Sequence, residues 1–284
     1  MNRFVAGPSI HRREGASPCF AIGDGAVILL YSFALFIVAG VHRALQAGAP
    51  DSVSAVVEFS AAQILALGAI YRLVRSAPGA VALSGADLAV ISCAALLLAS
   101  PFSVHPAFAG AGLAGLWLML RRRGDARLVA IGQLWLALGA YVSFGRLLFP
   151  LISEAIVRFE LEFMTGYGRI AGFRLPDGIP LVASDGWFIT LIERSWSFHN
   201  LSLAVLLWLS LTRLAGVGIR RRQLTALGVA VVLVLLLNAT RLMLMTGSRE
   251  SYPFWHDGTG AVLISSATLL AVLLPTAISL RRAL

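Results

Sequence analysis

Three polar residues with chemically useful side chains stand near the outer ends of the last three apolar stretches of this sequence. They are Ser195 in IERSWSFHNLS, Arg241 in NATRL and His256 in FWHDGTG. If these stretches cross a membrane, a nucleophile-type hydroxyl, a cation and an imidazole lie on the same side of it. Residues of these three types are those that a catalytic site uses.

Arg241 lies close to the outer end of its apolar stretch. An unpaired charge near the middle of a bilayer costs about 2.5–3.5 kcal/mol, so an arginine at this depth indicates either a function or an anchor that reaches the interface. Asn238 precedes Arg241 by three residues, and this spacing places both side chains on one helix face. An amide and a guanidinium on one face suggest binding of an oxyanion or a carbonyl group.

The serine and the histidines also have simpler interpretations. Ser195 stands where the next apolar helix should start, which is a common position for a serine that caps a helix. His199 follows four residues later, would share the helix face of Ser195 and could contact it. His256 can equally be a hydrogen-bonded residue at the membrane interface.

The amino-acid composition indicates whether these residues lie in a soluble protein or in a membrane protein. The 284-residue chain is 58% hydrophobic and only 13% charged, whereas soluble domains are about 25% charged, and its mean hydropathy is +0.83. We therefore expect an all-α polytopic membrane protein of eight spans, each near the ~20 residues that cross a bilayer, with the third and fourth spans forming a helical hairpin. The expected spans are 26–45, 53–73, 86–102, 104–120, 128–150, 196–214, 224–246 and 259–280.

The arginines indicate the orientation of these spans. Fifteen of the 23 basic residues, all of them arginines, fall before the first span, after the second, fourth and sixth spans, and at the end of the chain. The positive-inside rule then places both termini in the cytoplasm of an inner-membrane protein, with Ser195, Arg241 and His256 toward the periplasm. The net charge of +9 needs no nucleic-acid partner, because topology and contact with anionic membrane lipid explain the arginines.

The chain divides into a cytoplasmic leader (1–25), a five-span bundle (26–150), a periplasmic segment (151–195) and a three-span core (196–284). The first span could be a signal peptide instead, but Pro50 directly follows the small residues at which cleavage would occur. Neither of the two cysteines matches a zinc spacing and no phosphate-binding loop is visible, so we expect no metal and no cofactor.

The periplasmic segment contains two expected elements. Residues 152–164 alternate apolar and charged side chains with helical spacing, which suits a helix in the plane of the interface or an ordinary surface helix. Further on, the β-prone sequences IPLV and WFITLI flank SDG at 184–186, a pattern typical of a β-hairpin. Such a hairpin would deliver the chain to Ser195.

The order and setting of these motifs resemble the exosortase/archaeosortase family of multispanning sorting enzymes. The resemblance covers about the C-terminal half of the chain. GYGRIAGFRLPDGIPLV at 166–182 is similar to a glycine-containing lead-in, IERSWSFHNLSLA at 192–204 to a Cys-Ser-Gly motif, NATR at 238–241 to an Asn-x-x-Arg motif, and HDGTG at 256–260 to a His motif followed by glycine.

The resemblance implies a transpeptidase that cuts a C-terminal sorting signal from secreted envelope proteins outside the cytoplasmic membrane. Such signals are commonly Pro-Glu-Pro followed by a transmembrane helix and an arginine-rich tail. In this chemistry a cysteine thiolate attacks the peptide carbonyl, an arginine stabilises the oxyanion and a histidine transfers the proton. By resemblance these roles fall to Ser195, Arg241 and His256, with Asn238 and His199 supporting them.

The first motif departs from the family pattern at the nucleophile. The alignment places Ser195 at the position of the cysteine, Trp196 at that of the serine and Ser197 at that of the glycine. A serine hydroxyl, unlike a thiol, needs a positioned general base, which would be His256 or His199.

Two other functions stay open. The missing thiol is consistent with a catalytically silent homologue that binds sorting signals or supports exopolysaccharide assembly. A small-solute transporter, in which Arg241 binds a substrate anion, is the third candidate. Broken helices at matching positions of two halves would favour transport, and the sequence shows no such symmetry.

Overall fold

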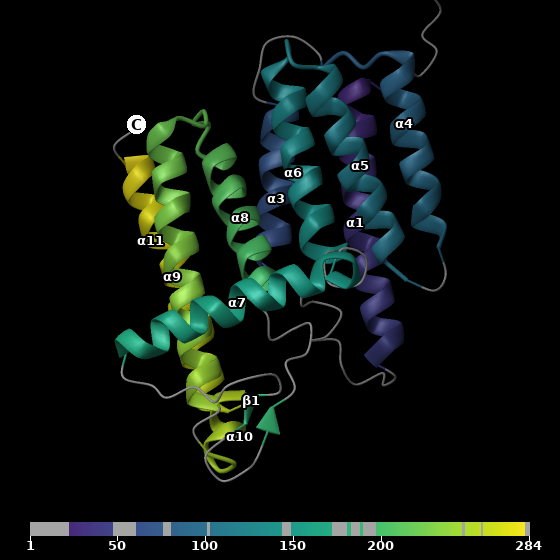
Figure 1. Ribbon diagram of the computed structural model, residues 1–284. Coiled ribbons are helices and arrows are strands. Elements are labelled where there is room, and N and C mark those ends of the chain that lie inside the picture. Colours follow the sequence, from purple (N-terminus) through teal and green to yellow (C-terminus); the bar gives the residue numbers. More distant parts are fainter. Residues whose placement is uncertain are drawn as a thin grey trace, which may run out of the picture.

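The computed structural model describes residues 23–47, 61–75, 81–100, 103–143, 149–171, 181–182, 188–189, 197–245, 248–256 and 258–281. Helices account for nearly all of them, and a helix overlaps each of the expected spans (Figure 1). The N-terminal helices are α1 (Asp24–Ala47), α3 (Ala61–Arg75), α4 (Gly85–Leu96), the 3-10 helix η1 (Leu97–Ala99), α5 (His105–Arg121) and α6 (Ala126–Ser143). The C-terminal helices are α8 (Ser197–Leu214), α9 (Arg221–Met245), α10 (Ser251–His256) and α11 (Thr259–Arg281).

Between these two groups lie α7 (Phe149–Ala171) and the two-residue strands β1 (Leu181–Val182) and β2 (Phe188–Ile189). The strands pair antiparallel, with Leu181 opposite Ile189 and Val182 opposite Phe188, in agreement with the expected hairpin. Residues 184–186, where we expect its turn, lie outside the described residues.

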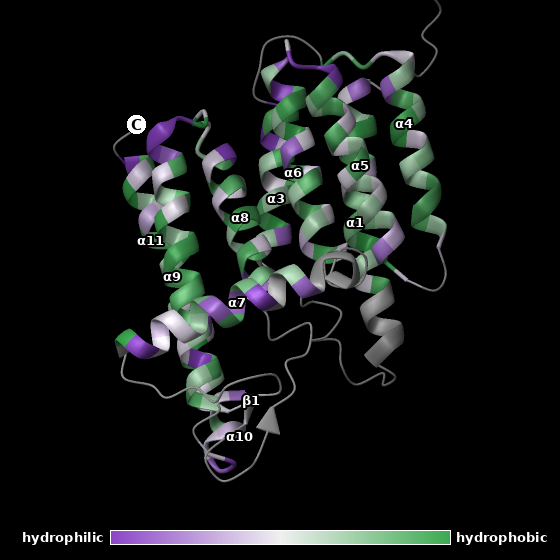
Figure 2. Ribbon diagram, in the orientation of Figure 1, coloured by the Kyte–Doolittle hydropathy of each residue, from purple (hydrophilic) through white to green (hydrophobic). Residues whose placement is uncertain are grey.

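The fold is that of an all-α protein whose apolar helices suit a membrane. Among the described residues, four segments are long and apolar enough to cross a bilayer, namely Asp24–Val41, Ala126–Ser143, Arg221–Met245 and Ser251–Arg281. Figure 2 shows hydrophobic residues along the middle of the bundle and hydrophilic residues toward its two ends. Many large apolar side chains point outward, among them Phe33 of α1 and Val262 of α11, which are 54% and 63% exposed. Lipid tails solvate such surfaces at no hydrophobic cost.

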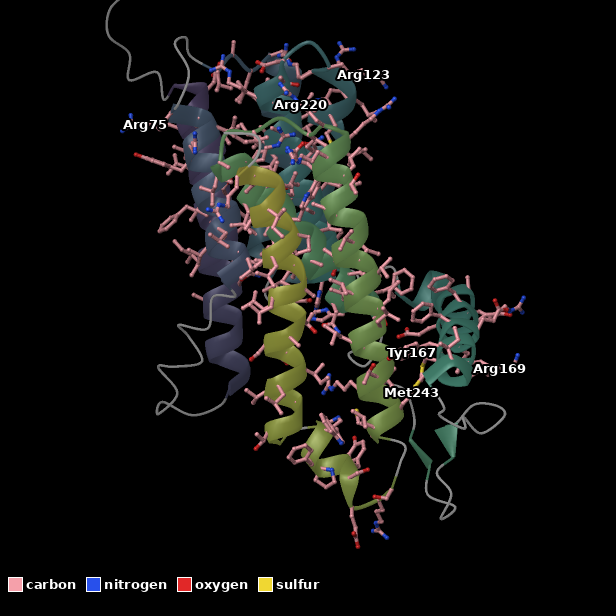
Figure 3. All side chains as sticks on the ribbon, turned by 90° about the vertical axis from the view of Figure 1, so that its left-hand side faces the viewer. Arg75, Arg123, Tyr167, Arg169, Arg220 and Met243 are labelled. Atoms are coloured by element: carbon pink, nitrogen blue, oxygen red, sulfur yellow. The ribbon has the colours of Figure 1, made fainter. Side chains whose placement is uncertain are left out.

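Helices of both groups share one core. α8 joins the two groups, because it packs against α3 and α6 on one side and α9 and α11 on the other. The core consequently extends without a break from Ile28 of α1 to Val272 of α11. Arg75, Arg123 and Arg220 mark one end of the bundle, the arginine-rich end, while α7 and α10 lie at the opposite end, the α7 end (Figures 1 and 3).

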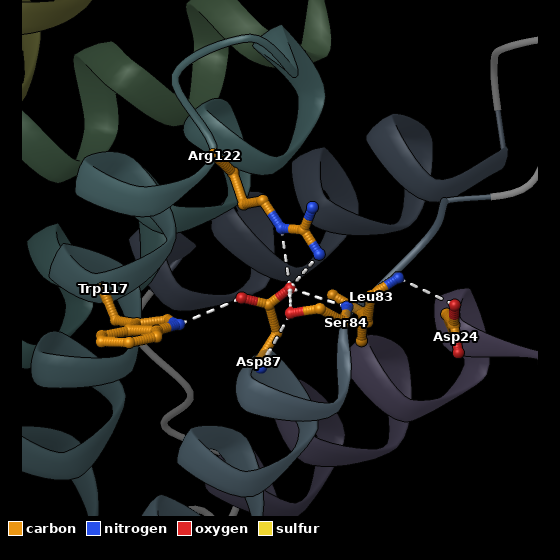
Figure 4. Close-up of polar contacts among 6 residues, drawn as sticks. All are labelled: Asp24, Leu83, Ser84, Asp87, Trp117 and Arg122. Atoms are coloured by element: carbon orange, nitrogen blue, oxygen red, sulfur yellow. Dashed lines mark hydrogen bonds and ion pairs between the residues drawn. The ribbon is translucent and has the colours of Figure 1, made fainter.

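A buried carboxylate organises the arginine-rich end (Figure 4). Asp87, which is fully buried, accepts a hydrogen bond from the Ser84 N–H at 2.8 Å, and the Asp87 N–H donates to Ser84 Oγ at 3.3 Å, which together form a capping box at the start of α4. The same carboxylate accepts a bond of 3.0 Å from Trp117 Nε1 and forms an ion pair with Arg122. Asp87 therefore ties the start of α4 to the end of α5.

Glycines bring α5 and α6 into direct backbone contact. A Cβ atom added at Gly139 of α6 would lie 2.6 Å from the carbonyl oxygen of Phe108 and 2.8 Å from the Cα of Gly112, both on α5. Small residues at helix contacts permit such close approach in membranes, where helix association relies on packing.

Gly139→Ala is expected to lower the free energy of unfolding by about 1–3 kcal/mol, because the added methyl group overpacks this contact. Gly228→Ala on α9 is the matched control, since a Cβ there meets nothing within 4 Å. The control should be neutral or stabilising by up to about 1 kcal/mol. Unfolding in mixed detergent micelles measures both, and equal stability of the two variants would contradict the close approach of α5 and α6.

One span boundary differs from the expectation. The fifth span was expected to continue to residue 150, but α6 ends at Ser143 and α7 already begins at Phe149. Pro150 fits there because the first turn of a helix needs no main-chain N–H from it. The change of direction separates an apolar span from an amphipathic helix that crosses the α7 end of the bundle (Figure 1).

Candidate functional site at the α7 end

A buried hydrogen-bond network joins α7, α8 and α9. Glu160 of α7, Ser197 at the start of α8 and Asn238 of α9 are only 2%, 2% and 3% exposed. Glu160 Oε1 accepts hydrogen bonds from the Ser197 N–H at 3.0 Å, from Ser197 Oγ at 2.5 Å and from Asn238 Nδ2 at 3.1 Å. Asn238 Nδ2 also donates to Ser197 Oγ at 2.8 Å, and Asn238 Oδ1 accepts from Asn200 Nδ2 at 3.2 Å. The network fixes the head of α8 to both neighbouring helices.

The buried face of α7 delivers Glu160 to this position. Glu160, Met164 and Gly168 follow one another at four-residue spacing and are all buried, so they form one stripe of the helix. Met164 packs with Met243 in a small hydrophobic cluster on α9, and Tyr167 Oη lies 3.0 Å from Thr240 Oγ1. Figure 3 shows Tyr167 and Met243 where α7 crosses α9. A carboxylate that accepts the first N–H of α8 also complements the positive end of the helix dipole.

Burial raises the pKa of Glu160, which lies in α7 outside the membrane-spanning segments. The hydrogen bonds from Ser197 and Asn238 act in the opposite direction but offset only part of this effect. Both of these partners are neutral, so they stabilise the charged carboxylate less than a cation would, and burial favours the protonated form.

Arg241 connects α9 to α10. Its Nε donates to the carbonyl oxygen of Trp255 at 3.1 Å, and its Nη2 donates to that of His256 at 2.9 Å. These carbonyls belong to the last turn of α10, where the helix leaves acceptors without intrahelical partners. The two bonds fix the plane of the guanidinium.

Arg241 also lines a cavity of ≈ 130 Å³ between α8, α9 and α11. Polar side chains from all three helices reach this cavity, namely Asn200 of α8, Arg241 of α9, and Ser265 and Thr268 of α11, and the rest of the lining is apolar. Because Asn200 also bonds to Asn238, the cavity borders the buried network. This cavity could bind a small polar group of a ligand.

The two candidate histidines have different neighbours. The ring of His256 stacks on Tyr252 within α10, with 4.7 Å between ring centroids and 21° between planes. The ring of His199 lies against Tyr141 of α6, with a centroid distance of 5.3 Å. His256 is thus on the side of Arg241, and His199 faces the N-terminal helices.

The structure brings together most, but not all, of the residues that the sequence singles out. At the α7 end Asn238 contacts the head of α8, and Arg241 contacts the backbone oxygen of His256 at the end of α10. Ser195 lies outside the described residues, so its expected contact with His199 is not described either. The described part of α8 begins at Ser197, so the prediction that Ser195 caps the sixth span stays a prediction.

Two members of the network were not predicted from the sequence as site residues. The resemblance places Ser197 at the position of a glycine, and Glu160 is one of the charged residues of the helix expected at 152–164. Helical spacing contained the signal for Glu160, because Met164 and Gly168 follow it at four-residue intervals on one face of α7. A carboxylate on such a face indicates a buried partner.

No family model, curated protein or solved structure matches this chain. Within the described part of the chain, no group of three His, Cys, Asp or Glu side chains is placed to hold a metal ion.

Proposed function

We propose that this protein is an exosortase-like membrane enzyme that cleaves the C-terminal sorting signals of secreted envelope proteins. The α7 end faces the periplasm in this proposal, and the arginine-rich end faces the cytoplasm. The observation that supports it most is the position of the NATR motif of α9. Through Asn238 this motif contacts the head of α8, and through Arg241, which lines the cavity, it contacts the last turn of α10, so that it links three motifs distant in sequence.

The proposed reaction is an acyl transfer. Ser195 Oγ attacks the carbonyl carbon of the scissile peptide bond while His256, or His199 in its place, accepts the hydroxyl proton. The tetrahedral oxyanion is stabilised by Arg241. Collapse of this intermediate breaks the C–N bond, the imidazolium returns the proton to the leaving amine, and the ester at Ser195 is resolved by water or by an acceptor nucleophile.

The described contacts supply two requirements of this chemistry. The carbonyls of Trp255 and His256 orient the guanidinium of Arg241 before substrate binds, and preorganised donors need little reorganisation during the reaction. Ser195 precedes the anchored Ser197 by two residues, and two residues of chain span at most about 7 Å. Glu160 and Asn238 act as positioning residues, because they hold the segment that follows the nucleophile.

A non-cleaving homologue that binds the same signals is the second candidate. It is favoured by the serine at position 195, where the resemblance places a cysteine. A serine hydroxyl is not ionised at neutral pH, so loss of a well-placed base would leave binding without chemistry.

Co-expression with a tagged reporter that ends in Pro-Glu-Pro, a transmembrane helix and an arginine-rich tail separates these candidates. The enzyme proposal predicts a shortened reporter, a loss of processing of about 10²–10³-fold in Arg241→Ala, and no processing in Ser195→Ala. Arg249→Ala is the matched control, because Arg249 is exposed in the turn before α10, and it should process normally.

Capture of the intact reporter without processing would favour the non-cleaving homologue. In that case Ser195→Cys should restore cleavage if the rest of the site is intact, whereas Ser266→Cys, which places a thiol on the exposed face of α11, should not. Normal processing by Ser195→Ala would contradict the serine mechanism.

A further inference from the structure

A second cavity lies at the other end of the molecule, on the surface between α9 and α11. It is a groove of ≈ 440 Å³, within the size range of about 300–1,000 Å³ that is usual for ligand sites. α9 contributes Arg222, Thr225, Ala226, Val229 and Leu233, and α11 contributes Leu270, Ala271, Leu274, Pro275, Ile278 and Ser279. None of these residues belongs to the site at the α7 end.

The groove has one cationic end and an apolar remainder. Arg222 is exposed in the first turn of α9 and lines the groove. Arg221 and Arg281 are also exposed, at the start of α9 and the end of α11. Beyond Thr225 the exposed side chains of the groove are aliphatic, such as Leu270 and Leu274, which are 51% and 57% exposed. This distribution is complementary to an amphiphile with an anionic head and a hydrocarbon tail.

The length of the groove fits one leaflet of a membrane. From Arg222 to Leu233, α9 rises about 16 Å at ~1.5 Å per residue. The hydrocarbon core of a bilayer is ~30 Å thick, so one leaflet contributes about half of that. A phosphate at the level of Arg222 therefore places the end of its acyl chain near Leu233.

We propose that this groove binds one anionic phospholipid, with its phosphate at Arg222 and one acyl chain between α9 and α11. Arg222 in its lining, with Arg221 and Arg281 at the same end of the two helices, distinguishes this occupant from a transmembrane peptide with a basic tail, which these arginines would repel. They also favour an anionic lipid over a zwitterionic one, because each basic residue near the membrane surface contributes separately to the attraction. The site is independent of the proposed sorting activity.

Native mass spectrometry of the full-length protein in detergent tests this site. Dioleoyl phosphatidylglycerol and dioleoyl phosphatidylcholine have the same acyl chains, and each is titrated separately. We expect a first adduct of phosphatidylglycerol to form at lower lipid concentration than that of phosphatidylcholine. Arg222→Gln should weaken the binding of phosphatidylglycerol about fivefold, which corresponds to the attraction of one basic residue.

Two further variants distinguish a specific lipid-binding site from non-specific electrostatic attraction. Arg123→Gln removes the same charge from the arginine-rich end outside the groove, and it should leave the first adduct unchanged. Val229→Trp fills the groove with a larger side chain at a half-exposed position. This variant should weaken the binding of both lipids. Equal binding of the two lipids, or equal losses in Arg222→Gln and Arg123→Gln, would overturn the proposal.

Discussion

Glu160→Ala is expected to release α7 from the head of α8 and to lower the free energy of unfolding by about 2–4 kcal/mol. The reason is that the Ser197 N–H and one donor of Asn238 lose their acceptor in a buried place, and each unsatisfied buried group costs about 1–3 kcal/mol. Hydrogen exchange of the amides in 149–171, together with unfolding in detergent, measures both effects. Glu162→Ala removes the same charge from an exposed position of α7 and should change neither.

Glu160→Gln separates the hydrogen bonds from the charge. Its carbonyl oxygen can still accept from Ser197, so α7 should stay docked. In the native protein burial raises the pKa of Glu160, and the contribution of this residue to stability is full below the ordinary pKa of about 4.3 and is lost as the pH rises through the raised pKa. After correction for intrinsic exchange rates, α7 should therefore loosen with rising pH in the native protein but not in Glu160→Gln. A pH response that persists in the variant would contradict this assignment.

Asp87→Ala is expected to lower the free energy of unfolding by about 2–4 kcal/mol, because loss of a helix cap costs about 1 kcal/mol and each buried hydrogen-bonding group left without its partner costs about 1–3 kcal/mol. The substitution leaves Arg122 without its carboxylate and also removes the acceptor for Trp117 and the capping box of α4. Chemical unfolding in detergent micelles measures the loss.

Asp125→Ala provides the comparison at the start of α6. Asp125 accepts hydrogen bonds from the N–H groups of Arg127 and Leu128, but its side chain is 33% exposed and its ion pair with Arg127 is long, at 4.0 Å. Loss of such a cap costs about 1 kcal/mol. Similar losses in Asp87→Ala and Asp125→Ala would show that the buried network around Asp87 contributes no more than an ordinary cap.

The helices were predictable from sequence because a helix that crosses a bilayer needs a long apolar run. A hydropathy profile detects such runs directly. The error at the end of the fifth span has the same origin. Apolar residues continue through FGRLLFP at 144–150, so a hydropathy average shows no break where α6 ends and α7 begins. The change of direction depends on how α7 packs against α9, which is a long-range contact that local hydropathy does not contain.

The site was only partly predictable for a similar reason. The three-residue spacing of Asn238 and Arg241 correctly indicated a common region of α9, but the two side chains bind different partners. Asn238 binds Glu160 and the head of α8, whereas Arg241 binds the carbonyls of α10. Spacing in the sequence predicts which residues share a helix face. It does not predict which other helix packs against that face.

The most direct test of the proposed sorting chemistry is mass spectrometry of the protein after rapid acid quenching in the presence of the reporter. The proposal predicts a fragment of the reporter, ending at its cleavage site, joined as an ester to Ser195, and no such adduct in Ser195→Ala. An ester on a different residue, or a reporter that is processed equally in Ser195→Ala, would contradict it.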